Sequence, residues 1–263
     1  MLGWIDLSHY NFHVVILLEP IQLKWMVKYK DQQSLGLRLH HYPYVIWILK
    51  HKAPSLCKTF KELETSYQIL PDNTTLKDIE SAFIQSLEDW IIYVTDLNIY
   101  DQLSFNNWDD QALLSLTDFK GKTIVDIGSG TGSQLFRMTP NAKNAYGVEP
   151  IGHLRTYLKE KAPSLELTHV YIVDGLLTEI PFHDHFSDIT VTGHVFGDLP
   201  EEELDELERI TKPGGTIILM PGNDDRDNEV HSFLLKNGFK YDRFFESGPS
   251  PSHGWKRKYW KTM

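Results

Sequence analysis

The sequence predicts an α/β fold in which a mostly parallel sheet ends in an antiparallel hairpin and follows a largely helical N-terminal extension. Three observations lead to this prediction. Short apolar strands alternate with helical patterns in the second half of the chain, a glycine-rich loop follows the first strand, and two strand-like runs close the chain. The 263 residues suffice for one large domain or two, and a hydrophobic content of 41% is typical of a globular chain.

The glycine-rich loop lies in residues 123–133, which read TIVDIGSGTGS. A β-branched apolar run ends in Asp126, which predicts a buried strand that leads into a tight loop. Three glycines alternate along the loop, at Gly128, Gly130 and Gly132. Residues 134–138 have a helix-forming composition and Pro140 ends them, so the loop lies between a strand and a helix. There the backbone can approach a ligand closely.

The spacing of the glycines separates two classes of ligand. The dinucleotide fingerprint G-x-G-x-x-G requires a glycine where this chain has Ser133. The pattern D-x-G-x-G-x-G found here resembles the first motif of the class I S-adenosylmethionine-dependent methyltransferases. That resemblance implies that the methionine end of the cofactor is bound by Asp126, Gly128, Ser129, Gly130 and Gly132.

Two further strands end in acidic residues. Residues 145–149 form a short predicted strand that ends in Glu149, about twenty residues after the first glycine, where a carboxylate can accept hydrogen bonds from both ribose hydroxyls. Nicotinamide enzymes also have an acid at this point, so Glu149 does not discriminate. Residues 167–173 alternate like a strand and end in Asp174-Gly175. The resemblance implies that Asp174 receives the adenine amino group and that Gly175 belongs to the same cofactor site.

The segments after Gly175 continue the alternation of predicted strands and helices. Residues 187–193 predict a fourth strand, an acidic helix extends to Ile210, and the turn Lys-Pro-Gly-Gly at 212–215 leads into a fifth strand at 216–220. This turn is similar to the late motif of the same family. Five matching features in the right order cover residues 122–221.

The C-terminal segments favour a hairpin. Residues 228–236 predict a helix, and residues 239–246 and 255–261 predict two antiparallel strands. A sheet of this kind resembles the doubly wound, seven-stranded methyltransferase sheet, whereas a nicotinamide domain repeats βαβ units to its end. The basic run at 256–258 is expected on an edge strand, with its charges in solvent.

The N-terminal extension becomes readable from Thr75. With Asp78 it forms a helix start, and apolar residues at helical spacing continue to Val94. A second helix is predicted at 108–116 with Asn107 as its cap. We place a boundary near residue 103, which gives an extension at 1–103 and a domain at 104–263. The resemblance implies that the extension lies over the cofactor on the acceptor side.

Composition excludes several classes of function. A net charge of −10 opposes an extended nucleic-acid surface. A single cysteine excludes an internal disulfide, which favours a reducing compartment. Since no apolar run approaches the ~20 residues that span a bilayer and no signal peptide is evident, we expect a cytoplasmic protein without a membrane partner. The scattered histidines of the first 70 residues predict no metal site, and the sequence specifies no oligomeric state.

The function implied by the resemblance is methyl transfer from S-adenosylmethionine, with S-adenosylhomocysteine as product. His194 follows the fourth strand, where it is the candidate base that takes a proton from the acceptor, or a residue that packs the loop. The strand ends in Thr-Gly-His-Val rather than Asn/Asp-Pro-Pro-Tyr, which favours a small-molecule acceptor. The alternatives are an NAD(P)-dependent oxidoreductase and an S-adenosylmethionine-binding protein without catalytic activity.

Overall fold

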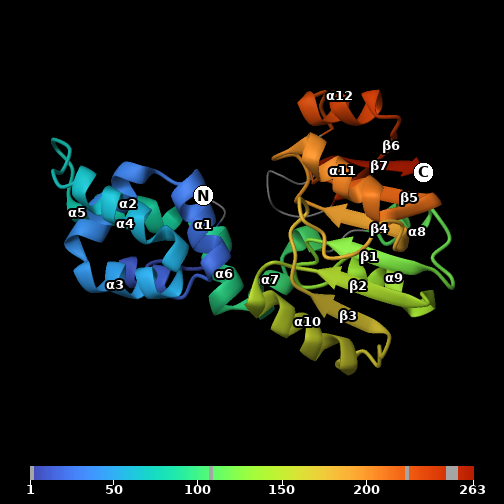
Figure 1. Ribbon diagram of the computed structural model, residues 1–263, viewed down its shortest axis with the longest axis horizontal. Helices are drawn as coiled ribbons and strands as arrows, with labels where there is room; N and C mark the ends of the chain where they lie inside the picture. The colour runs from blue at the N-terminus through green and yellow to red at the C-terminus, as the bar shows by residue number, and fades with distance from the viewer. Residues whose placement is uncertain (1–2, 107–108, 223–224, 247–253) are drawn as a thin grey trace. The chain divides into compact units, whose positions relative to one another are not determined.

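The computed structural model describes residues 3–106, 109–222, 225–246 and 254–263 (Figure 1). It divides the chain into two compact units, Met1–Tyr100 and Asp101–Met263. The division lies three residues before the boundary that the sequence analysis places at 103. Each unit is described by itself below.

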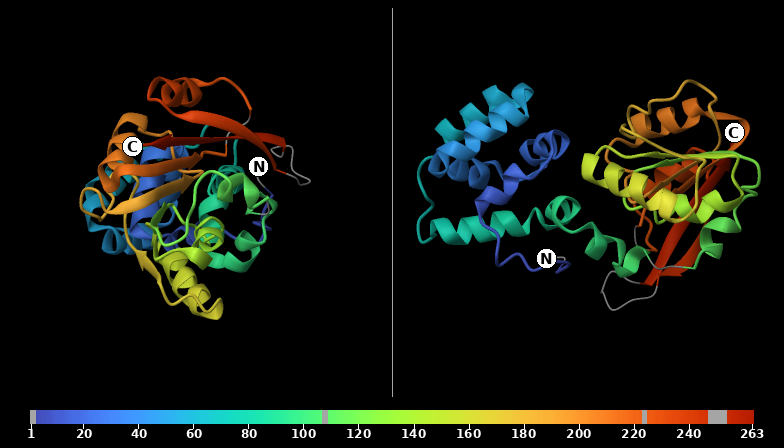
Figure 2. Two further views of the ribbon diagram at one scale, coloured as in Figure 1. Left: turned by 90° about the vertical axis from the view of Figure 1, so that its right-hand side faces the viewer. Right: turned by 90° about the horizontal axis from the view of Figure 1, so that it is seen from below.

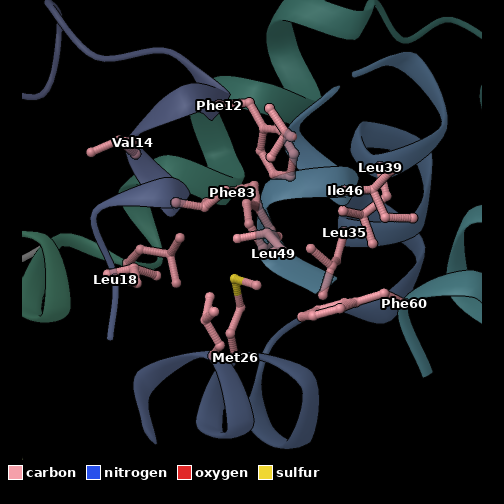
Figure 3. Packing of buried hydrophobic residues seen from close by; sticks show 14 of the residues in the cluster. Phe12, Val14, Leu18, Met26, Leu35, Leu39, Ile46, Leu49, Phe60 and Phe83 are labelled. Atoms are coloured by element: carbon pink, nitrogen blue, oxygen red, sulfur yellow. The ribbon is translucent and has the colours of Figure 1, made fainter. Parts of the chain in front are cut away.

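The first unit is helical within its described residues. Its helices and 3-10 turns, including α7 at the junction, are η1 (Phe12–Ile16), α1 (Pro20–Tyr29), α2 (Gln32–His41), α3 (Pro43–Lys52), η2 (Pro54–Leu56), α4 (Cys57–Ser66), α5 (Leu76–Gln85), α6 (Glu88–Thr95) and α7 (Leu97–Asp101). Figure 3 shows side chains from several of these helices, among them Phe12, Met26 and Phe60, in one apolar core. The unit therefore has a hydrophobic core of its own.

The sequence predicts one continuous helix from Thr75 to Val94, but the structure has two helices there. The prediction of a single helix was wrong. Its start is confirmed, because Thr75 and Asp78 form a reciprocal capping box. The Ser86 hydroxyl donates to the carbonyl of Phe83 at 2.7 Å, and the Ser86 amide bonds to Ala82 and Phe83. A serine that bonds to the preceding turn competes with helix continuation, and α5 ends there.

The second unit contains a seven-stranded sheet of order β3-β2-β1-β4-β5-β7-β6. Strands β1 to β5 run parallel to one another, whereas β7 runs antiparallel to both β5 and β6. The predicted mixed sheet with a terminal antiparallel hairpin is therefore confirmed. The strands are β1 (Thr123–Ile127), β2 (Asn144–Val148), β3 (Val170–Val173), β4 (Ser187–Gly193), β5 (Thr211–Met220), β6 (Lys240–Glu246) and β7 (Gly254–Thr262).

Helices cover both faces of this sheet (Figures 1 and 2). One face carries α8 (Gln111–Leu114), α9 (Leu135–Met138) and α10 (Gly152–Ser164), and the other carries α11 (Pro200–Ile210) and α12 (Glu229–Lys236). Short 3-10 turns η3 (Ser104–Asn106) and η4 (Thr139–Asn141) complete the unit. Because both faces are covered, the central strands are apolar on both sides, which explains their unbroken β-branched runs.

Several elements differ from their predicted bounds by one residue, and three differ by more. Strand β3 is shorter than predicted, since residues 167–169 precede it. Strand β5 begins at Thr211, so the Lys-Pro-Gly-Gly turn lies within its span, and its register with β4 shifts between Ser187 and Ile189. Helix α8 is only four residues long. Its proposed cap, Asn107, lies outside the described residues.

The basic run at 256–258 is not on an edge strand, and that prediction was wrong. Strand β7 lies between β5 and β6, and all three basic side chains are buried. Arg257 pairs with Asp225 at 2.8 Å, and Lys258 lies 3.9 Å from Asp242. The sequence places the hairpin last in the chain, but the outer position belongs to β6.

None of the helices in the described part of the chain combines the length and the apolar character that crossing a bilayer requires.

Candidate functional site

The order of the strands places a crevice at the centre of the sheet. The chain builds outward from β1 through β2 to β3, then returns to β4 on the other side of β1. Ligands of open α/β sheets bind outside the carboxyl ends of the strands at such a switch point. The glycine-rich loop follows β1 there, and His194 follows β4.

The loop is held over the neighbouring strand by its own backbone. The amides of Gly128 and Ser129 both bond to the Val148 carbonyl of β2, at 2.8 and 3.2 Å. Gly128, Gly130 and Gly132 all have positive φ, which L side chains rarely adopt. A Cβ on Gly132 would lie 2.2 Å from the Phe136 ring. The loop therefore needs its glycines both for conformation and for space.

Asp126 is the most buried of the three predicted cofactor acids, with 1% of its surface exposed. Burial raises its pKa to about 7, and hydrogen bonds from the Ser129 side chain and the Leu135 amide oppose this shift only partly. Its Oδ2 atom has no hydrogen-bond partner among the described residues. The buried Gln134 Oε1 atom, on the residue before Leu135, shares this condition.

Asp126 and Gln134 lie on the same face of the sheet. Asp126 is in register with Val191 on β4, and Gly193, two residues further on, lies on that same face. Gln134 packs against Gly193, since a Cβ there would lie 1.9 Å from Gln134 Nε2. Buried polar groups normally find partners, and two acceptor atoms without donors are suited to a cationic ligand group.

Glu149 follows β2 directly and its carboxylate turns back toward the loop. Oε2 accepts the Gly130 amide at 2.9 Å and Oε1 accepts the Ile151 amide at 3.0 Å. Burial raises the pKa of Glu149 to about 7, and these amides offset that effect in part. Since a carboxylate has about four acceptor positions, each oxygen retains capacity for a ligand hydroxyl.

Asp174 and Gly175 follow β3, the outer parallel strand. The Asp174 side chain is 71% exposed and accepts from Arg155 at 2.9 Å. Arg155 also donates to the carbonyl of Glu149 at 2.8 Å, so one guanidinium connects the ends of β2 and β3. A Cβ on Gly175 would lie 2.6 Å from Pro181, which explains why this tight turn has a glycine.

His194 has a positive φ of 62°, unusual for a residue other than glycine. Its ring rests against Gly222, where a Cβ would lie 2.0 Å from His194 Nδ1, and it lies 5.8 Å from the Phe105 ring. His194 is exposed to solvent. Surrounding protein atoms and the charge of Lys256 lower its pKa, so that the ring is neutral at pH 7.

The structure adds residues that the sequence analysis missed. Besides Gln134, Lys161 of α10 donates to the Thr131 carbonyl inside the loop at 3.2 Å. Arg137 of α9 donates to the Ser133 and Asn106 carbonyls, at 2.7 Å each. Of these, Gln134 had a sequence signal, since a polar residue directly after the glycine loop falls at the start of the following helix.

The arrangement suits binding and alignment. No group of three or more potential metal ligands occurs among the residues that the structure describes. The crevice offers loop amides, the buried acceptor atoms of Asp126 and Gln134, the carboxylates of Glu149 and Asp174 at successive strand ends, and a neutral imidazole. These groups can hold a cationic, hydroxyl-bearing ligand and can accept a proton beside it.

Comparisons with known proteins agree with this geometry. Residues 125–219 match the family model of a methyltransferase domain. Over 143 residues the chain is 26% identical to an uncharacterized methyltransferase of Anoxybacillus flavithermus, an alignment that covers 52% of this chain and 65% of that protein. It is also 26% identical over 119 residues to a demethylmenaquinone methyltransferase of Bacillus cytotoxicus, with 43% and 50% covered.

Among solved structures, a SAM dependent methyltransferase from Aquifex aeolicus has the same fold. The TM-score is 0.51 at 21% identity, and the match covers 64% of this chain and 97% of that one. The chain spans about half to two thirds of the length of the first curated relatives that it matches, 51 to 65%.

Proposed function

Because this chain belongs, through residues 125–219, to the class I S-adenosylmethionine-dependent methyltransferase family, we propose that it transfers a methyl group from S-adenosylmethionine to a small-molecule acceptor. The observation that carries the proposal is the pair of buried acceptor atoms Asp126 Oδ2 and Gln134 Oε1, next to the glycine loop at the switch point. An aminoacyl ammonium group is the natural partner of such a set.

The residues present fit this cofactor. Asp126 and the backbone of the loop would hold the methionine end, and Glu149 has acceptor capacity left for the ribose hydroxyls. Asp174, at the end of β3, would accept the adenine amino group. Bound there, the cofactor supplies an electrophilic methyl group on a sulfonium.

The protein's contribution to the reaction is mainly alignment. The loop and the strand ends fix the donor, and most of the acceleration comes from orientation of the two reactants. His194, neutral and at the end of β4, accepts the proton that the acceptor loses. Its low pKa keeps it in the basic form at neutral pH.

Two observations favour a small molecule as the acceptor. The net charge of −10 opposes broad contact with nucleic acid, and β4 ends in Thr-Gly-His-Val rather than the motif used on exocyclic or amide nitrogens. A relative named demethylmenaquinone methyltransferase supports the same class of acceptor, since its name refers to a quinone.

The first test compares thermal unfolding with S-adenosylmethionine, S-adenosylhomocysteine, NAD and NADP, each in excess. A ligand at a hundred times its dissociation constant stabilises by ~2.7 kcal/mol, which raises the midpoint by a few degrees. We expect the adenosyl compounds alone to act, and Asp126→Ala to abolish the shift. Stabilisation by the nicotinamides instead would support an oxidoreductase and overturn the proposal.

Turnover separates an enzyme from a protein that only binds the cofactor. Release of S-adenosylhomocysteine is measured with pooled small phenols, thiols, amines and quinols. His194→Gln is expected to lower kcat at least tenfold while leaving the affinity for S-adenosylmethionine unchanged. If no acceptor gives turnover although the cofactor binds, the chain is a binding protein.

A further inference from the structure

The loop that carries His194 connects β4 to α11 and consists of residues 194–199, here called the β4–α11 loop. At its start, the His194 amide donates to the Met220 carbonyl of β5 at 3.1 Å. The φ of His194 is 62°, a conformation that a residue other than glycine keeps only where the surrounding structure enforces it. The position of the imidazole therefore depends on how the rest of the loop is held.

Two side chains directly after His194 pack against neighbouring elements. Val195 lies over the glycine-rich loop, since a Cβ on Gly128 would lie 2.8 Å from the Val195 methyl groups. Phe196 is buried in the core that α11 helps to form. The first half of the β4–α11 loop is thus held by side-chain packing.

The second half of the loop is held by an acid on α11. Glu203 Oε2 accepts the Gly197 amide at 2.6 Å, and Glu203 Oε1 accepts the Leu199 amide at 3.1 Å. Gly197 has no side chain to pack, and Asp198 and Leu199 are exposed. The carboxylate, rather than side-chain packing, therefore fixes this part of the loop.

The Glu203 carboxylate is buried and belongs to a well-packed part of α11. Its residue is 3% exposed, and Leu204 and Leu207 of the same helix lie in the core against the sheet. Burial raises the pKa of Glu203, and the Gly197 and Leu199 amides oppose that shift. Because a buried carboxylate without donors is unfavourable, the folded protein retains these two hydrogen bonds.

Capping of α11 does not account for both hydrogen bonds. The helix begins at Pro200 with Leu199 as its N-cap, and a side chain in the first turn that caps a helix reaches back to the N-cap amide. Gly197 lies two residues before the N-cap, so its amide is not one of the helix. Glu203 thus holds the loop in addition to capping the helix.

We propose that Glu203 is a positioning residue for His194, because its carboxylate fixes the β4–α11 loop and, through the loop, the place of the imidazole. The inference rests on the proposed function, in which the imidazole accepts the proton that the acceptor loses. A base must lie within hydrogen-bond reach of the proton that it takes, and small displacements of a reacting group slow a reaction. Glu203 acts through the loop backbone and is not itself a catalytic residue.

The test follows the titration of His194 by NMR in the full chain with isotope-labelled histidine, which requires no acceptor. The His194 signal is identified by its absence in His194→Gln. Surrounding protein atoms and the charge of Lys256 lower the His194 pKa in the wild-type chain. We expect Glu203→Ala to raise this pKa toward that of a free imidazole, and to accelerate hydrogen exchange of the Gly197 and Leu199 amides roughly tenfold.

Three comparisons separate a positioning role from a purely structural one. Glu202→Ala removes an exposed acid from the adjacent position of α11 and should change neither the titration nor the exchange. Glu203→Gln keeps one acceptor oxygen and should restore part of the wild-type behaviour of His194. Calorimetry with S-adenosylhomocysteine should give Glu203→Ala nearly the wild-type affinity, because the glycine-rich loop has its own bonds to the Val148 carbonyl.

The outcomes distinguish this inference from the proposed function. An unchanged His194 titration in Glu203→Ala, or loss of S-adenosylhomocysteine binding by that variant, would overturn the positioning role and leave the proposed function intact. Fast exchange of the Gly197 and Leu199 amides in the wild-type chain would also overturn it, even where the alanine variant fails to fold. Failure of the wild-type chain to bind S-adenosylhomocysteine would overturn the proposed function and, with it, the role of Glu203.

Discussion

Asp126 and Glu149 are buried carboxylates at the ends of two adjacent strands. Burial raises the pKa of each to about 7, and the charge of Asp126 adds to the effect on Glu149. In the unfolded chain these acids titrate near 4. The folded protein therefore binds more protons between pH 4 and 7, and its free energy of unfolding falls as pH rises through that window. The two acids favour ligand binding at the expense of stability at neutral pH.

The same shifts predict how cofactor binding depends on pH. An ionised Asp126 attracts an ammonium group, so binding is weak while the acid is protonated. Between pH 6 and 8 the ionised fraction of a group with a pKa near 7 rises about tenfold. We expect the affinity for S-adenosylhomocysteine, measured by calorimetry, to rise about tenfold over this range.

Two variants test whether Asp126 causes the pH dependence of cofactor binding. Asp126→Asn should reduce the pH dependence as well as the affinity, because the amide does not titrate. Glu160→Gln, an exposed position on α10, should change neither. An affinity of the wild-type chain that stays constant from pH 6 to 8 would contradict the assignment.

How far the site can be predicted depends on the kind of residue. The glycines and the acids at strand ends have local signals. The residues next to them in sequence indicate both the backbone conformation of the loop and the point where each strand ends. Gln134 has a local signal in its place after the glycine loop, but the burial of its Oε1 atom without a partner has none. That condition depends on how the helix after the loop packs against β4.

At the scale of elements, Lys161 connects α10 to the glycine loop. Its ammonium donates to both carboxylate oxygens of Asp101, at 2.8 and 2.7 Å, and to the Thr131 carbonyl. Burial favours a higher pKa for Asp101, but the hydrogen bonds from Lys161 and its neighbours outweigh it and lower the pKa. The lysine thus fixes the peptide between Gly130 and Gly132.

Removing this lysine should loosen the loop. We expect Lys161→Met to weaken binding of S-adenosylhomocysteine three- to tenfold, because the loop amides lose a fixed orientation. Calorimetric titration measures the change. The control is Lys159→Met, an exposed lysine on the same helix. Equal affinity for the two variants would show that the contact does not position the loop.

Helices α2 and α4 meet at Gly36. A Cβ there would lie 2.6 Å from the Leu63 carbonyl oxygen and 2.5 Å from the Tyr67 ring. Alanine normally stabilises a helix interior by about 0.5–1 kcal/mol relative to glycine. Here the overlap should prevail, so we expect Gly36→Ala to destabilise the first unit by about 1–3 kcal/mol in denaturant unfolding. Gln33→Ala, exposed on the same helix, should change stability by less than about 0.5 kcal/mol.

The elements that the sequence predicted well are those with a local pattern. Strand β4 has its predicted bounds, Ser187–Gly193. A β-branched run between polar residues indicates a strand and no other element. The burial of Arg257 was not predictable in this way. Its acidic partner Asp225 is distant in sequence, and only the position of β7 inside the sheet brings them together.

At the scale of the whole molecule, the two units have separate interiors. The core of the first unit consists of residues before Val94, and the sheet of the second is packed by residues after Leu103. The cofactor residues proposed above all belong to the second unit. A unit with its own core is able to unfold by itself, so two-state behaviour of the full chain is not expected.

This separation predicts two transitions in differential scanning calorimetry. S-adenosylhomocysteine should raise the midpoint of one transition by a few degrees, since it binds only the folded second unit. Gly36→Ala should lower the midpoint of the other. The two changes should add in the variant with ligand, because each acts on a different core. A single transition that responds as a whole to both the ligand and the substitution would mean that the units unfold together, and the division into independent cores would then be wrong.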